Sequence, residues 1–447
     1  MNVEGSVLAD CIRMMQLPAF TLRLLVFLFV FSHSFSAAVP QLDGHWEGAI
    51  AQPAGELKMT VEFVRQGDIA RGTFTLPAVG AFKWPLKITG DSPKVRFALP
   101  TGLAFDGELQ GDTISGRVQS PTGGHVDPFL LKRTKAPAVP YTEEEVRFQS
   151  GGVTLVGTLR LPLTKEKHPA VFLLQGSGAV DREGESFYGD AFARAGIATL
   201  LYDKRGVGGS GGDFRQQSLA DEASDALAGI HYLQGRREID PGRVGLYGRS
   251  HGGIVAPLAA SLSRDVAFII NVSGAGVPPY QQVTYQAAAQ MRRDGFAEAE
   301  ITEAVAYMHQ KWDVARAGGA GWEQLQAATE AARGKRWLPR AQPASKLDDI
   351  VPSWKLQMSY DPMPAFEKVT CPVLAVFGEL DTLTPVAETT RNLREGLQKA
   401  KNRNVTITVF PSADHALLVW PGQNDQTHWP TLAPGYVDTL INWLRTK

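Results

Sequence analysis

Val244-Gly245-Leu246-Tyr247-Gly248-Arg249-Ser250-His251-Gly252-Gly253-Ile254 is the stretch of this 447-residue chain that decides its fold. It combines a short apolar strand, a sharp turn of the pattern G-x-S-x-G, and the start of an apolar helix. A serine on such a turn lies in strained backbone, and the flanking glycines let strand and helix approach without a clash of side chains. The pattern predicts that Ser250 is a nucleophile whose hydroxyl projects from the end of a strand.

Strand and helix patterns alternate on both sides of this turn. Short apolar runs that do not alternate with polar residues are typical of strands buried on both faces of a parallel sheet. Such runs lie at residues 170–174, 198–202, 244–247, 267–272 and 373–377, and helical patterns occupy residues 186–195, 219–233 and 251–263. We therefore expect an α/β domain with a mostly parallel, doubly wound sheet, which binds ligands beyond the carboxyl ends of its strands.

One connection in this domain is far longer than the others. Between residues 272 and 373 the chain has three helix-like runs, at residues 280–294, 298–316 and 322–332. Long connections inside a compact fold are usually functional. We expect a helical cap over the active site, at about residues 277–365.

The N-terminal part has a different periodicity. From residue 42 to about residue 133, apolar residues recur at every second position in about eight short runs separated by turn signals. Regularly spaced strands without a helical period predict a separate all-β domain, a small antiparallel barrel or sandwich, over residues 39–133. Trp46 and Trp84 leave open a carbohydrate- or lipid-binding role beside a packing role. A proline-containing linker, residues 134–142, leads into the α/β domain of residues 143–447.

Residues 1–38 predict a signal peptide. Arg23 precedes an apolar run at residues 24–31, and Ser36-Ala37-Ala38 supplies the small residues of a cleavage site. A run of eight residues is too short to span a bilayer, so we expect export to the periplasm or the medium without stable membrane insertion, an uncleaved anchor being the alternative. Cleavage would leave Cys371 as the sole cysteine and exclude an internal disulfide.

The charges of the chain nearly balance, with 45 Lys and Arg against 46 Asp and Glu. Nucleic-acid partners call for a basic excess, so we expect none. Neither an H-E-x-x-H motif nor a phosphate loop occurs, and we therefore expect no metal and no cofactor.

A serine hydroxyl needs a histidine to take its proton. In folds with this turn the order along the chain is serine, acid, histidine, and only His415 and His428 follow the candidate acids. His415 lies in a short loop directly after the apolar run at residues 405–410, where a base can reach the serine. We prefer His415, with His428 as the alternative.

The acid that orients this histidine should follow the preceding strand. Asp381 lies in the loop after residues 373–377, and Glu379 in the same loop is the runner-up. Asp414 adjoins the histidine in sequence, and neighbouring residues rarely present their side chains to each other, so we expect Asp414 to be structural.

Two backbone N–H groups should stabilise the oxyanion that forms on the substrate. One is that of His251, the residue after the nucleophile, and the other comes from the loop after an early strand. That loop reads Gln175-Gly176-Ser177-Gly178. We expect Ser177, or less favourably Gly178, to supply the second donor.

As an ordered set, these motifs resemble the α/β-hydrolase superfamily. More narrowly, the chain is similar to bacterial exported esterases with an N-terminal β-domain, related to serine aminopeptidase-like and acyl-transferase- or thioesterase-like hydrolases. The resemblance covers about residues 145–447. One departure is Gln175, where relatives commonly have histidine. The matching residues are Gln175 to Gly178 with Asp181-Arg182, Tyr202 to Gly206 with Gly208 and Ser210, the turn around Ser250, Cys371 to Leu374 with Gly378 and Asp381, and Asp414-His415.

These expectations combine into one hypothesis. The resemblance and the ordered residues imply a carboxylesterase-type serine hydrolase, in which Ser250, Asp381 and His415 cleave esters of short or medium acyl chains through an acyl-enzyme. A serine peptidase, aminopeptidase or thioesterase would use the same triad, and a non-catalytic binding protein is the remaining alternative. The expected partner is a small-molecule ester, and the oligomeric state stays open.

Overall fold

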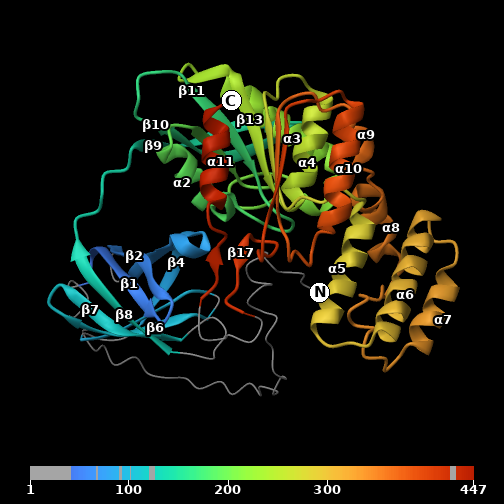
Figure 1. Cartoon of the computed structure of the whole chain (residues 1–447), viewed down its shortest axis with the longest axis horizontal. Helices are drawn as coiled ribbons and strands as arrows, with labels where there is room; N and C mark the ends of the chain where they lie inside the picture. The colour runs from blue at the N-terminus through green and yellow to red at the C-terminus, as the bar shows by residue number, and fades with distance from the viewer. Residues whose placement is uncertain (1–41, 67–68, 90–92, 101, 120–125, 423–428) are drawn as a thin grey trace. The chain divides into compact units, whose positions relative to one another are not determined.

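The computed structural model describes residues 42–66, 69–89, 93–100, 102–119, 126–422 and 429–447 (Figure 1). The predicted signal peptide and His428 lie outside these residues. The chain divides into two compact units. Within the described residues, one unit comprises Pro140–Leu418 and Ala433–Lys447, and the other runs from residue 42 to Val139 and includes Val419–Leu432. In the part of the chain that is described, no helix has the length and apolar character needed to cross a membrane.

The N-terminal unit is a closed antiparallel barrel of eight strands, in which β1 pairs with both β2 and β8. Of the two predicted architectures, barrel and sandwich, the closed pairing shows the barrel. The strands coincide closely with the eight alternating runs of the sequence. They are β1 (Gly44–Gln52), β2 (Gly55–Gln66), β3 (Ile69–Leu76), β4 (Ala81–Thr89), β5 (Lys94–Ala98), β6 (Ala104–Gln110), β7 (Thr113–Gln119) and β8 (Val126–Thr134).

Aromatic side chains fill the inside of the barrel. Phe97 and Phe105 stack with ring centroids 4.8 Å apart, and Phe129 meets both edge-on. Trp46 has no exposed surface and donates its indole N–H to the carbonyl of Leu42 at 2.8 Å. The idea that Trp46 is an exposed ligand-binding aromatic is therefore wrong, because period two turns its side chain into the core.

A segment from the C-terminal part of the chain completes the barrel unit. Trp429 is buried in the barrel core, and its indole N–H donates to Asp127 at 3.0 Å. Its backbone N–H donates to the side chain of Gln52, also at 3.0 Å. The α/β domain predicted over residues 143–447 is thus interrupted, because Val419–Leu432 belongs to the barrel unit. The chain leaves the α/β unit four residues after His415.

The second unit contains the predicted doubly wound sheet. Its eight strands lie in the order β16-β15-β14-β13-β11-β12-β10-β9. The pairings from β12 to β16 are parallel, whereas β10 and β9 pair antiparallel at one edge. The strands are β9 (Tyr141–Ser150), β10 (Val153–Pro162), β11 (His168–Leu174), β12 (Ala198–Tyr202), β13 (Ile239–Arg249), β14 (Ile269–Val272), β15 (Val373–Gly378) and β16 (Val405–Phe410).

Helices cover both faces of this sheet. Figure 1 shows α2 and α11 on one face and α3, α4 and α10 on the other. The buried faces of α3, α4 and α10 pack on the apolar strands, and cover on both faces is why the strands carry no polar alternation. The helices are α2 (Ser186–Arg194), α3 (Leu219–Gln234), α4 (His251–Leu262), α10 (Val386–Lys399) and α11 (Tyr436–Arg445).

The long connection between β14 and β15 is helical, as predicted. Its three main helices lie within two residues of the predicted runs and share a core of their own, in which Trp312 and Trp337 are buried. The elements are α5 (Pro279–Arg293), α6 (Glu298–Arg316), α7 (Trp322–Ala331), η4 (Leu347–Asp349), α8 (Val351–Ser353), the π-helical turn η5 (Trp354–Met358) and α9 (Met363–Phe366).

Candidate active site

Ser250 occupies the strained turn between β13 and α4. Its backbone angles are φ 53° and ψ −115°, a region that residues other than glycine rarely adopt. A Cβ on Gly248 would overlap the carbonyl of Gly252, and a Cβ on Gly252 would overlap the carbonyl of Leu174. Both glycines of the G-x-S-x-G pattern are therefore required by close backbone approach, as the sequence predicted.

His415 lies beside this serine. Its Nε2 is 2.9 Å from the Oγ of Ser250, and its Nδ1 is 2.8 Å from Oδ2 of Asp381. All three side chains are buried. The structure thus brings together the three residues predicted from their order in the chain, and the relay from carboxylate to imidazole to hydroxyl is continuous.

Backbone groups hold both partners of the serine in place. The Oδ1 of Asp381 accepts the N–H groups of Leu383 and Thr384 at 2.7 and 2.8 Å, which leaves Oδ2 to the histidine. The hydroxyl of Ser273 donates to the carbonyl of His415 at 2.9 Å. The geometry of the pair is therefore fixed from two loops and does not depend on the histidine alone.

The two other acids near the histidine in sequence have different roles. Glu379 is exposed and accepts the backbone N–H of Ser412 at 2.9 Å. The Oδ1 of Asp414 accepts the N–H groups of Ala416 and Leu418, as expected for a structural turn residue. The hydrogen-bond partners of the His415 ring are instead Asp381 and Ser250.

A second histidine–carboxylate pair lies next to the serine. The Nε2 of His251 is 2.8 and 3.0 Å from the two carboxylate oxygens of Glu222 on α3. Burial alone would raise the pKa of Glu222, but His251 and the nearby Lys204 lower it, so the carboxyl is ionised. The side chain of His251 is thus bound to Glu222 and is not a base for the serine.

The residue before the serine is also paired. The guanidinium of Arg249 lies 2.7 Å from the carboxylate of Glu185, which is 1% exposed. The turn that carries Ser250 is therefore held by the Arg249–Glu185 ion pair on one side and by the hydrogen bond between His251 and Glu222 on the other.

These flanking pairs were missed in the sequence. A signal for one of them existed, because Glu222 lies three residues after Leu219 and four before Ala226, on the apolar face of its helix. An acid at such a position is buried and needs a partner. The identity of the partner depends on the tertiary fold.

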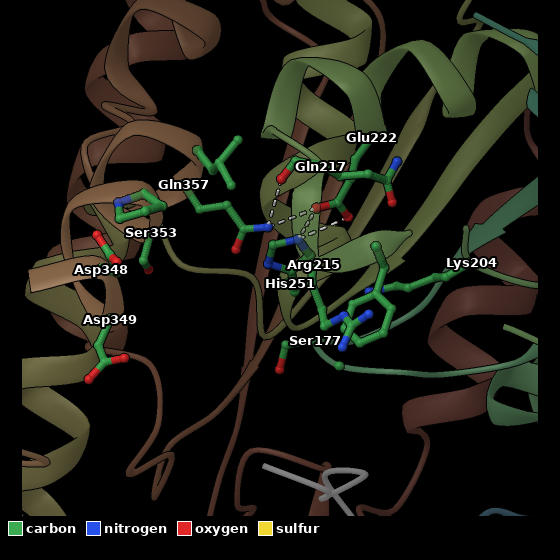
Figure 2. Close-up of a pocket in the computed structure, with 14 residues that line it drawn as sticks. Ser177, Lys204, Arg215, Gln217, Glu222, His251, Asp348, Asp349, Ser353 and Gln357 are labelled. Atoms are coloured by element: carbon green, nitrogen blue, oxygen red, sulfur yellow. Dashed lines mark hydrogen bonds and ion pairs between the residues drawn. The ribbon is translucent and has the colours of Figure 1, made fainter. Parts of the chain in front are cut away.

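A cavity of about 310 Å³ lies between the cap and the sheet, beside His251, the residue that follows the nucleophile (Figure 2). It is lined by Ser177 and His251, the two predicted oxyanion residues, and by Gly178. From the cap, Gln357 reaches across the cavity, with its amide nitrogen 3.4 Å from Glu222. The remaining lining is mostly polar, so the cavity suits a small group that forms hydrogen bonds.

Comparison with known families gives a match over most of the chain. Residues 111–417 match the profile of the X-Pro dipeptidyl-peptidase (S15) family. The chain belongs to this family. This S15 member is therefore a hydrolase of the α/β-hydrolase type, as its fold indicates.

Curated relatives match shorter segments of this S15 hydrolase. The quorum-quenching protein AidA of Acinetobacter baumannii is 32% identical over 133 residues, which cover 29% of this chain and 44% of that protein. Human dipeptidyl peptidase 8 is 31% identical over 157 residues, 32% of this chain and 17% of that protein. The chain spans less than half the length of these relatives. An esterase of Pyrococcus furiosus aligns over 70% of this chain and 96% of its own, at 18% identity and a TM-score of 0.45.

Proposed function

We propose that this S15 hydrolase cleaves carboxylic esters through an acyl-enzyme, with Ser250 as the nucleophile. The observation that carries the proposal is the hydrogen-bonded series from Asp381 through His415 to the Oγ of Ser250, at 2.8 and 2.9 Å. A buried carboxylate, an imidazole and a hydroxyl in this series can activate the hydroxyl at neutral pH.

The reaction has two halves. As Ser250 attacks the ester carbonyl, Nε2 of His415 takes the hydroxyl proton and then delivers it to the departing alcohol oxygen. In the second half the same nitrogen takes a proton from water as the water attacks the acyl carbonyl. It returns this proton to Oγ of Ser250 when the bond from Oγ to the acyl carbon breaks and the carboxylic acid leaves. Asp381 holds the imidazole in the required tautomer and stabilises its cation in both halves.

Negative charge on the carbonyl oxygen needs donors that are already in place. The backbone N–H groups of His251 and Ser177 are the candidates. His251 is the first residue of α4, where the N–H groups have no partner inside the helix. Ser177 lines the same cavity.

The cavity favours small, polar substrate groups. A volume of about 310 Å³ suits an acyl or alcohol group of up to about ten non-hydrogen atoms, since one water occupies about 30 Å³. The side chains of Glu222, Ser353 and Gln357 offer hydrogen-bond acceptors to it (Figure 2). Short esters with hydroxyl or amide groups are therefore expected to react faster than esters of long alkyl chains.

A peptidase activity is the second candidate, because of the family and of the dipeptidyl peptidase among the relatives. Parallel assays of p-nitrophenyl esters and of aminoacyl naphthylamides distinguish the two. Faster turnover of the naphthylamides would favour the peptidase.

The test of the nucleophile is Ser250→Ala. Loss of the triad serine should lower p-nitrophenyl acetate hydrolysis by about 10⁴-fold or more. Circular dichroism and thermal unfolding of the variant check that the fold is intact. A variant that keeps full activity would exclude Ser250 as the nucleophile.

A further inference from the structure

Lys204 is a buried lysine directly after β12. Its side chain is 5% exposed, and its Nζ donates to the backbone carbonyl of Gly176 at 2.6 Å. Burial lowers the pKa of the Lys204 ammonium, against the opposing effect of Glu222 and Glu185. Placing a lysine here costs free energy, so its hydrogen bond to a backbone carbonyl calls for an explanation.

The neighbours of Lys204 have a different kind of partner. Asp203 pairs with Arg182 at 2.8 Å, and Arg205 pairs with Asp225 at 2.6 Å. Both of these pairs join two side chains and tie the loop after β12 to adjacent elements. The Lys204 side chain instead holds the backbone of another loop, the one that follows β11.

The carbonyl that accepts from Lys204 belongs to the peptide bond between Gly176 and Ser177, whose N–H is a candidate oxyanion donor. In a planar trans peptide the carbonyl of one residue and the N–H of the next point in opposite directions. When Lys204 fixes the Gly176 carbonyl on its own side, the N–H of Ser177 must point to the other side. Among the described residues, no backbone carbonyl accepts a hydrogen bond from this N–H. Ser177 lines the cavity together with His251.

We propose that Lys204 is a positioning residue of the oxyanion hole, which fixes the Gly176–Ser177 peptide so that the Ser177 N–H meets the developing oxyanion. The inference rests on the proposed function, because it assumes acyl transfer at Ser250. Lys204 itself does not touch the substrate carbonyl in this role. Its contribution is the orientation of a donor before the reaction begins.

The competing role for this side chain is to compensate the negative charges of Glu222 and Glu185, because its ammonium also interacts electrostatically with both carboxylates. Two substitutions separate the roles. Lys204→Met keeps the length and removes both the charge and the donor, whereas Lys204→Gln removes the charge and keeps an N–H donor. A positioning role predicts rescue by glutamine, and charge compensation predicts none.

The matched control is Lys311 in the cap. It is also buried, and its Nζ donates to two backbone carbonyls, those of Ala341 and Gln342, at 2.9 and 3.1 Å. Lys311→Met reports what the loss of a buried, carbonyl-binding lysine does to this protein away from the serine. Its thermal stability should fall, and kcat should stay within about twofold of the wild type.

The experiment measures p-nitrophenyl acetate hydrolysis per active site, with active sites titrated by a fluorophosphonate. Loss of one oxyanion donor costs about 10²–10³-fold in kcat, and a misoriented donor is expected to cost about 10- to 100-fold in Lys204→Met, with KM within about twofold. Lys204→Gln should stay within about fivefold of the wild type. Trifluoroacetone, which forms a tetrahedral adduct with the serine, should inhibit Lys204→Met more weakly by the same factor as kcat/KM falls.

Three results would overturn the inference: unchanged kcat in Lys204→Met, equal losses in Lys204→Met and Lys204→Gln, or trifluoroacetone inhibition that does not follow kcat/KM. Failure of the proposed function looks different, because the wild type itself would then hydrolyse no ester or Ser250→Ala would remain active.

Discussion

Two histidine–carboxylate pairs flank the nucleophile, and they are alike in composition and in length. In the pair of His415 with Asp381 and in that of His251 with Glu222, the acid is buried and the nitrogen–oxygen distance is 2.8 Å. They differ in which ring nitrogen meets the acid. His415 gives Nδ1 to its carboxylate and keeps Nε2 for Ser250, whereas His251 gives Nε2 to its carboxylate.

The difference shows that a histidine does not become the general base merely by lying next to the serine in sequence. His251 is the sequence neighbour of Ser250, but the first turn of α4 directs its ring toward α3. Its backbone N–H is the part that remains available to the substrate. His415 is 165 positions away in sequence, and the carboxyl ends of parallel strands bring its ring to the serine.

The roles of the two pairs can be tested separately by changing the carboxylate of each pair into an amide. Asp381→Asn should lower kcat for p-nitrophenyl acetate by about 10³–10⁴-fold, because an amide stabilises the wrong tautomer of the imidazole and cannot offset its positive charge. The matched control is Glu379→Gln in the same loop, which should stay within about twofold. Near-normal rates in Asp381→Asn would mean that another group orients His415.

Glu222→Gln tests the other pair and should have a much smaller effect on the chemistry. It keeps the shape and leaves His415 untouched, so kcat for p-nitrophenyl acetate should fall by less than about tenfold, a small effect beside loss of a triad acid. It removes a carboxylate from the cavity, and the preference for hydroxyl-bearing over alkyl esters of equal length should decrease. Steady-state kinetics on glycerol monobutyrate and butyl butyrate measure this ratio, and an unchanged ratio would contradict the assigned role of the cavity.

The smallest expected effect is on stability as a function of pH. The folded-state pKa of Glu222 lies below its ordinary value of 4.5, so its contribution to stability is present above that pH and is lost as the pH falls through the folded pKa. At pH 7, Glu222→Gln should lower the free energy of unfolding by about 1–3 kcal/mol. Urea unfolding at several pH values should show this difference narrowing below about pH 4.5, and a constant difference would argue against an ionised Glu222 in the fold.

Much of this architecture could be predicted because local patterns specify it. Period two marks every strand of the barrel, and the order serine, acid, histidine leaves few candidates for the triad. The paired acid Glu222 lies on a recognisable apolar helix face, but its partner His251 is 29 positions away and depends on packing. Trp429 was missed because nothing in its polar surroundings indicates that residues 419–432 join the barrel.

The central claim is that the pair of His415 and Asp381, and not that of His251 and Glu222, activates Ser250. The most direct measurement is the rate at which a fluorophosphonate labels Ser250 in Asp381→Asn and in Glu222→Gln, followed by mass spectrometry of the labelled peptide. The account predicts labelling slowed by about 10³-fold or more in Asp381→Asn and by less than about tenfold in Glu222→Gln. Equal slowing in both variants, or wild-type labelling of Asp381→Asn, would contradict it.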